Sequence, residues 1–206
     1  MKRSLIAFLI CLSASCCATP DQSENLSSLQ KIPDSLAGMS LESLADDYRA
    51  RLFGSYLPFW EHGGIDGQNG GFICHLNDDG LPVDWEKNLW YQGRGLWVYS
   101  FLYNNFGHEQ KYLDIARKTY GFLTKQMYVG DGGWHELVDR DGKIIESEGL
   151  SVFGLLFTAN GLAEYHRATG EPRALELTLE TLHAALERYD SPGYRGVFLP
   201  GDLSTI

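Results

Sequence analysis

Five stretches of the sequence carry apolar residues at helical spacing, and they are of two kinds. In residues 88–106 and 149–167, apolar side chains cover nearly every side of the helical wheel, so each predicted helix needs neighbours all round. In residues 41–52, 109–127 and 173–189, apolar residues lie on one side and charged residues on the other. The two kinds alternate along the chain as outer, inner, outer, inner and outer helices.

Short glycine-rich segments separate these helices, and two of them are copies of one pattern. Gly70-Gly71-Phe72 is followed by Asp79-Gly80, and Gly132-Gly133-Trp134 is followed by Asp141-Gly142, with 62 positions between Gly70 and Gly132. An Asp-Gly pair is typical of a tight turn, so each copy predicts a short β-hairpin. A third copy is expected to begin at Gly193-Tyr194. The chain therefore contains an internal repeat of about sixty residues.

The alternation of helices predicts an all-α fold in which helical hairpins form a ring. In such a ring the inner helices contact neighbours on every side, and the outer helices keep one face in water. An open solenoid of helix pairs has the same local pattern and stays an alternative, although the heavily aromatic inner helices favour a closed ring. Each inner helix begins just after a hairpin, so the hairpins and the inner-helix N-termini are expected at one end.

One permanent charge, Arg94, lies within the apolar helix of residues 88–106, one turn after Trp90. A buried guanidinium needs an oxygen partner, because leaving it unpaired is costly. Two interpretations stay open: a core arginine paired with Glu86 or Asp66, and a pocket arginine that binds a ligand. Both Trp90 and Arg94 lie in the first two turns of the helix, where free backbone N–H groups favour oxygen-rich ligands. An aromatic wall, an arginine and free donors suit a sugar.

Composition describes an acidic, globular protein. Of its 206 residues 44% are hydrophobic and 13% aromatic, which excludes a disordered chain. The 27 acidic and 17 basic residues give a net charge of −10, and no basic cluster follows the first three residues. This argues against nucleic acid and against an anionic membrane surface as partners. The sequence carries no zinc-ligand spacing, phosphate loop or Ser-His-Asp spacing, so neither a metal nor a cofactor is expected.

The first stretch, residues 1–18, is predicted to be a secretory signal peptide. Two basic residues precede an apolar run, Leu5 to Leu12, that is too short to span a bilayer. Small residues at positions 16 and 18 fit ordinary cleavage after Ala18. Lipidation of Cys16 or Cys17, as in a bacterial lipoprotein, is the other interpretation and is favoured by the two cysteines at the end of the apolar run. The protein is therefore expected to be secreted or periplasmic, with a lipid anchor in a bacterial membrane if one of these cysteines is modified.

The remaining sequence is interpreted as a tether followed by one domain. Residues 19–38 are polar and contain Ser and Pro, which is typical of a flexible segment. The domain is expected to cover residues 39–206. Cys74 has no partner in this part of the chain, so no disulfide framework is expected.

The segment Lys87-x-x-Trp90-x-Gln92-Gly93-Arg94-x-x-Trp97 resembles a motif of the N-acylglucosamine 2-epimerase family. The Gly-Gly-aromatic hairpins and residues 163–170 are similar to the same family, and the likeness runs from about Leu41 to Gly196. The motif within an aromatic helix is quite specific, whereas the hairpins alone are not. The resemblance implies an (α/α)6 barrel that acts on a small free sugar such as N-acylglucosamine, mannose or cellobiose.

The resemblance also implies a reaction, namely removal of the proton next to the carbonyl of a ring-opened sugar. Such chemistry needs a base, for which histidine is suited, and a group that stabilises the enolate, for which arginine is suited. Carried over to this sequence, Arg94 binds the sugar oxygen or the enediolate, and Trp90 lines the pocket. The two catalytic histidines of the family are expected beyond Ile206. No catalytic residue is therefore assigned within the chain, which is expected to be inactive alone.

The sequence departs from the family in its length and in one pocket residue. A ring of six repeats needs more than about 300 residues, so the chain is expected to be the N-terminal half of the barrel. A pocket tyrosine of the family corresponds to Leu150. His62, His75 and His135 lie in or beside the hairpins and are expected to be surface or loop residues.

Two other functions stay open at this point. One is a non-catalytic, surface-located half-barrel that binds carbohydrate. The other is a polysaccharide hydrolase or lyase on a similar toroid, because a fold does not determine a function. Acidic pairs such as Asp78-Asp79, and Glu146 with Glu148, are more often solvated turn residues than a glycosidase acid–base pair.

Overall fold

The computed structural model describes residues 33–146, 151–192 and 194. The predicted signal peptide with Cys16 and Cys17, most of the predicted tether, Leu150 and Gly193 lie outside the described residues. The chain divides into two compact units, with the boundary between Asp46 and Asp47. None of the described helices combines the length and the apolar character needed to cross a membrane.

The described part of the first unit is a small β-hairpin followed by the start of a helix. Strand β1 (Ser35–Leu36) pairs antiparallel with β2 (Met39–Ser40). The two residues between them both have positive φ, as a type I′ turn requires. The Ser40 hydroxyl accepts a hydrogen bond from the backbone N–H of Ser43 and so caps helix α1 (Leu41–Arg51). The end of the predicted tether is therefore ordered as a strand.

The helical stretch that begins with α1 continues well past its predicted end. It runs on through η2 (Leu52–Tyr56), α2 (Leu57–Phe59) and η3 (Trp60–Gly64). The sequence signal is weak here because Gly54 and Pro58 are both poor helix residues. The wider π-type turns on either side of α2 accompany this proline, which cannot donate a backbone hydrogen bond.

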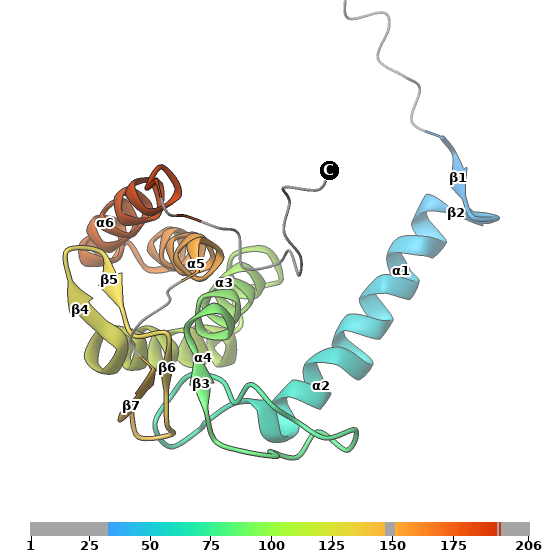
Figure 1. The fold of residues 1–206 in the computed structure, drawn as a ribbon. Coiled ribbons are helices and arrows are strands. Elements are labelled where there is room, and N and C mark those ends of the chain that lie inside the picture. Colours follow the sequence, from blue (N-terminus) through green and yellow to red (C-terminus); the bar gives the residue numbers. More distant parts are fainter. Residues whose placement is uncertain (1–32, 147–150, 193, 195–206) are drawn as a thin grey trace, which may run out of the picture. The chain divides into compact units, whose positions relative to one another are not determined.

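Four longer helices make up about half of the described second unit and confirm the predicted helical segments to within three residues at each described end. Helix α3 packs against α4 and α5, and α5 packs against α6 (Figure 1). Side chains that precede the two inner helices cap them: the Asn88 amide oxygen accepts from Trp90 N, and the Ser151 hydroxyl accepts from Gly154 N. The helices are α3 (Leu89–Asn105), α4 (Gln110–Phe122) with its extension η4 (Leu123–Met127), α5 (Val152–Thr169) and α6 (Pro172–Tyr189).

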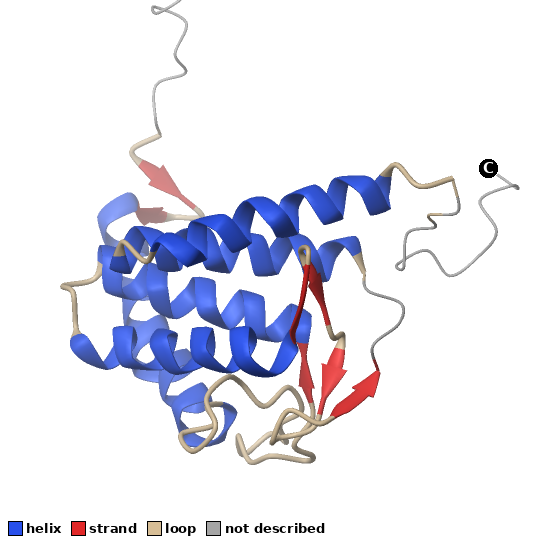
Figure 2. Cartoon of the chain, turned by 90° about the vertical axis from the view of Figure 1, so that its left-hand side faces the viewer, coloured by secondary structure: helices blue, strands red, loops and turns tan. Residues whose placement is uncertain are grey.

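Short strands gather at one end of these helices (Figure 2). Strand β4 (Tyr128–Gly130) pairs with β5 (Gly133–Trp134). Strand β6 (Leu137–Val138) lies between β3 (Lys87–Asn88) and β7 (Ile144–Glu146). Because β3 leads directly into α3, this small sheet fixes the start of the inner helix at the hairpin end.

Both predicted Asp-Gly turns are present. The N–H of Gly80 donates to Asn77 O over 2.9 Å, and the N–H of Gly142 donates to Asp139 O over 3.1 Å. In the first copy the flanking residues form only isolated bridges, Ile65 with Phe72 and Leu76 with Pro82, rather than regular strands.

The internal repeat is confirmed by equivalent contacts. Gly70 has a positive φ, and a Cβ built there would lie 2.4 Å from the backbone oxygen of Lys118. Gly132 also has a positive φ, and its Cβ would lie 2.2 Å from the backbone oxygen of Glu180. The glycines are 62 positions apart, and so are the two residues they approach. Each hairpin therefore meets the outer helix that follows it in the same way, and only glycine fits there.

Helices α3 and α5 approach each other through two glycines. A Cβ on Gly161 would lie 2.4 Å from the backbone oxygen of Gly93, and a Cβ on Gly93 would lie 2.6 Å from Thr158 N. Such distances bring the two backbones into direct contact. The glycine of the Gln92-Gly93-Arg94 segment therefore has a packing role.

Replacing Gly161 by alanine is expected to lower the free energy of unfolding by about 1–3 kcal/mol, because the added methyl group pushes α3 and α5 apart. Gly121 is the matched control, since it lies within α4 and a Cβ there meets nothing within 4 Å. Gly121→Ala is expected to raise stability by up to about 1 kcal/mol through helix propensity. Urea unfolding of both variants measures the difference, and equal effects would contradict the close crossing.

The inner helices do not contact neighbours on every side within the described residues, as expected of a chain that supplies only part of a ring. Each of them leaves an apolar side exposed. Tyr91 on α3 is 42% exposed, and Phe153 and Leu156 on α5 are 40% and 41% exposed. The two inner helices therefore present an uncovered aromatic surface.

Candidate functional site

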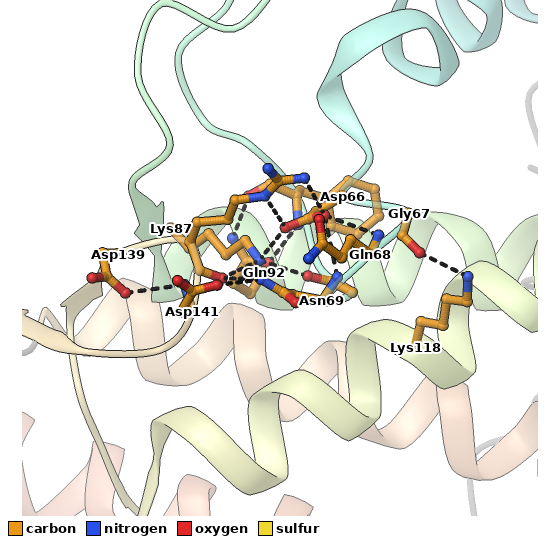
Figure 3. A network of polar contacts seen from close by, with 12 residues as sticks. Asp66, Gly67, Gln68, Asn69, Lys87, Gln92, Lys118, Asp139 and Asp141 are labelled. Carbon is orange, nitrogen blue, oxygen red and sulfur yellow. Dashed lines mark hydrogen bonds and ion pairs between the residues drawn. The ribbon is translucent and has the colours of Figure 1, made fainter.

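Lys87 opens the motif and is completely buried. Its ammonium group donates to Asp66 Oδ2 over 2.9 Å, to Gly70 O over 2.8 Å and to Arg140 O over 3.0 Å (Figure 3). The nitrogen also lies 3.9 Å from the centre of the Phe122 ring. Lys87 therefore joins the first hairpin loop (residues 66–70) to the turn of the second hairpin at Arg140. Because all three of its N–H donors are satisfied, none is left for a ligand.

Asp66 is the acid at the centre of this network. Besides Lys87, its carboxylate accepts from Nε and Nη2 of Arg140, both over 3.1 Å, and from the backbone N–H groups of Gln68 and Asn69. Burial alone would raise the pKa of Asp66, but the hydrogen bonds from Arg140 and Lys87 outweigh it and hold this pKa well below its usual value. Burial lowers the pKa of Lys87, and the ion pair with Asp66 opposes that change.

Gln92 holds the first hairpin on α3. Its Oε1 accepts from Phe72 N over 2.7 Å, and its Nε2 donates to Phe72 O over 2.8 Å. Gly71 leaves room for this amide, since a Cβ there would lie 2.5 Å from Gln92 Oε1. The ring of Phe72 in turn occupies the space above Gly95. Like Lys87 and Gly93, Gln92 has its function inside the fold.

Arg94 differs from the other members of the motif. It is exposed, and no carboxylate of the described residues lies within ion-pair distance of it. Its guanidinium carbon lies 5.2 Å from the centre of the Phe157 ring on α5. The interpretation of Arg94 as a core arginine paired with Glu86 or Asp66 is therefore wrong, and Asp66 is instead bonded to Lys87 and Arg140.

Trp90 lies one turn before Arg94 and is half-buried against α5. Its ring stacks on Phe157 with a centroid distance of 5.3 Å and on Phe153 with a centroid distance of 6.3 Å. Phe157 therefore has the Trp90 indole and the Arg94 guanidinium as neighbours. This row of rings holds the arginine against a rigid aromatic wall.

A cavity of about 350 Å³ lies beside Arg94. Trp90 is not among the residues that line it, although Trp90 and Arg94 both contact Phe157. Tyr99 is buried, and its hydroxyl has no hydrogen-bond partner among the described residues. Burial raises the pKa of this hydroxyl well above its usual value, so Tyr99 stays neutral. The lining residues are Leu57, Trp60, Phe72, Tyr91, Arg94, Gly95, Val98 and Tyr99.

No histidine lines this cavity within the described part of the chain. His62 is exposed in η3, and His75 is exposed and bonded to Asp84 over 2.6 Å. His135 is half-buried, with a buried Nδ1 that has no hydrogen-bond partner among the described residues. His75, Asp84 and Glu86 place three ligand atoms within 4.8 Å of one another, at the surface. The absence of a metal stays a prediction.

Three residues around Arg94 were not predicted from the sequence. Tyr91 and Val98 lie one turn before and one turn after Arg94 on α3, so helical spacing alone can identify them. Phe157 comes from α5, and only the packing of the two helices brings it to the site. A single arginine among aromatic residues gave no sign of which helix it would meet.

The scan against protein-family models matches residues 70–198 to the family described as N-acylglucosamine 2-epimerase (GlcNAc 2-epimerase). This match covers more than half of the sequence, including both hairpins and helices α3 to α6. The chain belongs to the N-acylglucosamine 2-epimerase family. The predicted resemblance is thereby confirmed.

Relatives within the family are about 30% identical to this chain over the aligned residues. A cellobiose 2-epimerase from Dictyoglomus turgidum is 33% identical over 144 residues, which are 69% of this chain and 36% of that protein. An N-acylglucosamine 2-epimerase from Mus musculus is 31% identical over 157 residues, which are 72% of this chain and 37% of that protein. The chain thus spans about a third of the length of these relatives, which is consistent with the predicted partial barrel.

The same family likeness holds for the fold. The solved structure of cellobiose 2-epimerase from Spirochaeta thermophila superposes with a TM-score of 0.64 and 30% sequence identity, over 71% of this chain and 36% of that one. The fold of the second unit therefore matches the (α/α)6 epimerase barrels over about a third of them, which favours the predicted ring over the open solenoid.

Proposed function

We propose that this chain is part of a sugar 2-epimerase or aldose–ketose isomerase in which Arg94 binds the reacting oxygen of a ring-opened sugar. The observation that carries the proposal is the division of tasks within the motif. Lys87, Gln92 and Gly93 are each committed to contacts inside the fold. Of these four motif residues only Arg94 lines a cavity, and no carboxylate of the described residues lies within ion-pair distance of it.

The proposed chemistry is proton transfer at C2 of the open-chain sugar. A base removes the C2 proton, the electron pair moves into the carbonyl and an enediolate forms with its negative charge on oxygen. Arg94 is suited to stabilise that charge, because a guanidinium stays protonated and donates two parallel hydrogen bonds. Return of a proton to the opposite face of C2 gives the epimer, and its return to C1 gives the ketose.

The described residues support binding rather than the proton transfer itself. The cavity beside Arg94 offers aromatic surface from Tyr91 and Trp60 and the N–H donors of the Arg94 guanidinium. A sugar presents apolar C–H faces and hydroxyl edges, which match these two kinds of group. Since no described histidine lines the cavity, we propose that the base comes from outside the described residues and that the 206-residue chain alone is inactive.

The test is deuterium exchange at C2. The protein as produced by its source is incubated in D2O with cellobiose, with an N-acylglucosamine and with mannose, and the products are followed by NMR. Deuterium is expected at C2 of at least one of these sugars, whereas the 206-residue chain gives none. Absence of exchange with every sugar contradicts the proposal. Saturable sugar binding without exchange supports the alternative of a non-catalytic carbohydrate-binding protein.

A further inference from the structure

A second hollow lies on the outer side of α4, away from the residues that surround Arg94. It measures about 490 Å³ and is formed by α4, its extension η4 and the first hairpin loop. Three cations line it, namely Arg117, Lys118 and Lys125, and one acid, Asp141. This hollow is called the basic groove below. It stands out because the protein as a whole carries a net charge of −10.

The charges of the basic groove are only partly used by the fold. The Lys118 ammonium donates to Gly67 O over 2.9 Å, as seen at the edge of the network in Figure 3, and two further N–H donors remain. Arg117 lies 3.8 Å from Asp114, an ion pair beyond hydrogen-bond distance, and it also interacts with the Tyr165 side chain. The one acid, Asp141, already accepts from the Asn69 amide over 2.7 Å. The groove therefore has an excess of positive charge.

The internal repeat shows that the fold does not require these cations. Shifting Arg117, Lys118 and Lys125 by 62 positions gives Leu179, Glu180 and Glu187 on α6. The frame around them is the same, because each hairpin glycine touches the backbone of the equivalent outer-helix residue. One copy of this frame is thus basic and the other acidic. A structural role common to both copies cannot explain the positive charge of the first.

Gly121 adds a second observation on the same groove. It lies within α4, where glycine is unfavourable by about 1 kcal/mol, and a Cβ there would meet nothing within 4 Å. No packing contact therefore requires a glycine. The missing side chain leaves the groove open between Arg117 and Lys125, which lie one turn before and one turn after it.

We propose that the basic groove binds a phosphate monoester with a polyhydroxyl body. The three lining cations outnumber the one lining acid, and such an excess of positive charge suits a phosphate monoester, which carries a charge of about −2 at neutral pH. An arginine fork and lysine point charges are the usual side-chain partners of phosphate. The amides of Gln68 and Gln126, which also line the groove, can bond hydroxyl groups. This proposal does not depend on the proposed epimerase reaction.

The experiment is calorimetric titration of the purified chain with glucose 6-phosphate, inorganic phosphate and glucose at low salt. Glucose 6-phosphate is expected to bind with a Kd of about 1 mM or tighter, inorganic phosphate several-fold more weakly and glucose not measurably. Binding is expected to weaken with added salt. Equal binding of glucose and glucose 6-phosphate, or no binding of any phosphate, overturns the proposal.

Two variants separate a site from general attraction between charges. Lys125→Glu introduces the residue found at the equivalent place in the second copy and is expected to weaken binding at least tenfold. Lys111→Glu makes the same charge change elsewhere on α4, at an exposed residue paired with Glu109 over 3.6 Å, and is expected to change Kd less than twofold. Equal weakening by the two variants contradicts a defined site.

A third variant tests the shape of the groove without changing its charge. Gly121→Leu is expected to abolish binding of glucose 6-phosphate, because the new side chain extends into the open space. Circular dichroism and thermal unfolding confirm that each variant is folded. Should Gly121→Leu fail to fold, Gly121→Ala serves instead with a smaller expected loss. Unchanged affinity in a folded Gly121→Leu protein overturns the proposed location.

Discussion

Replacing Asp66 by alanine is expected to lower the free energy of unfolding by about 3–5 kcal/mol, the largest effect of any single substitution in the described chain. The variant leaves the Lys87 ammonium fully buried with only two carbonyl oxygens as partners. It also frees the guanidinium of Arg140, which Asp66 binds with both oxygens. Urea unfolding, monitored by circular dichroism at neutral pH, measures the loss.

Asp47 provides a matched control for burial. Its carboxylate lies 2.9 Å from the guanidinium of Arg51, the same distance as between Asp66 and Lys87, but both partners of this pair are exposed. Asp47→Ala is expected to cost at most about 1 kcal/mol. The double variant Asp66→Ala/Lys87→Met is expected to recover part of the loss, since no unpaired ammonium remains. Similar costs for the Asp66 and Asp47 variants would show that burial of the pair contributes little.

The same network gives stability a pH dependence of defined sign. The pKa of Asp66 is lower in the folded protein than its unfolded value of about 3.9. Its stabilising contribution is therefore fully present above that unfolded value and is lost as the pH falls through the folded pKa. Acid unfolding of the wild type contains this contribution, and that of Asp66→Ala lacks it.

Much of the fold could be predicted from the sequence, but this network could not. Helical spacing and the 62-residue repeat identified the helices and both turns, because they depend on local pattern. Residues with contacts far along the chain were not predictable in the same way. Lys87 and Arg140 are 53 positions apart, and no local signal indicates that one bonds the backbone of the other.

The candidate site was predictable in identity but not in environment. Arg94 and Trp90 stood out as a charge and a large ring in one apolar helix. From the sequence, Asp66 could pair with Arg94 or with another cation. In the structure Asp66 pairs with Lys87 and Arg140, and Arg94 is left exposed beside a cavity. The sequence also predicted that the inner helices of a complete ring would be covered on every side. The exposed side chains of Tyr91, Phe153 and Leu156 show that these helices carry more apolar residues than the described chain can bury.

Burial divides the polar residues and the glycine of the motif into two groups, those that stabilise the fold and one that can bind a ligand. Lys87, Gln92 and Gly93 are buried, and their contacts are complete within the chain. Arg94 is exposed, and its partner among the described residues is an aromatic ring, Phe157. Substitutions in the first group should lower stability, whereas substitution of Arg94 should leave stability nearly unchanged. The two groups can therefore be distinguished by measuring unfolding and activity on the same variants.

Arg94→Lys is expected to lower kcat for the sugar reaction by about 10²–10³-fold, with a smaller change in KM. The negative charge on the substrate oxygen develops mainly in the transition state, so the interaction with Arg94 strengthens there. A lysine keeps the charge but loses the fork of two parallel hydrogen bonds and the flat contact with Phe157. The measurement is C2 exchange in D2O with the protein as its source produces it, together with the midpoint of urea unfolding.

The control for this variant is Arg167→Lys, which changes an exposed arginine paired with Glu164 at the far end of α5. It is expected to leave kcat unchanged, and both variants are expected to unfold within about 0.5 kcal/mol of the wild type. Since Arg94 forms no ion pair with any acid that the structure describes, a loss of activity at constant stability indicates a lost interaction with the substrate. Retention of more than a third of the wild-type kcat in Arg94→Lys would instead place the stabilisation of the enediolate on another group.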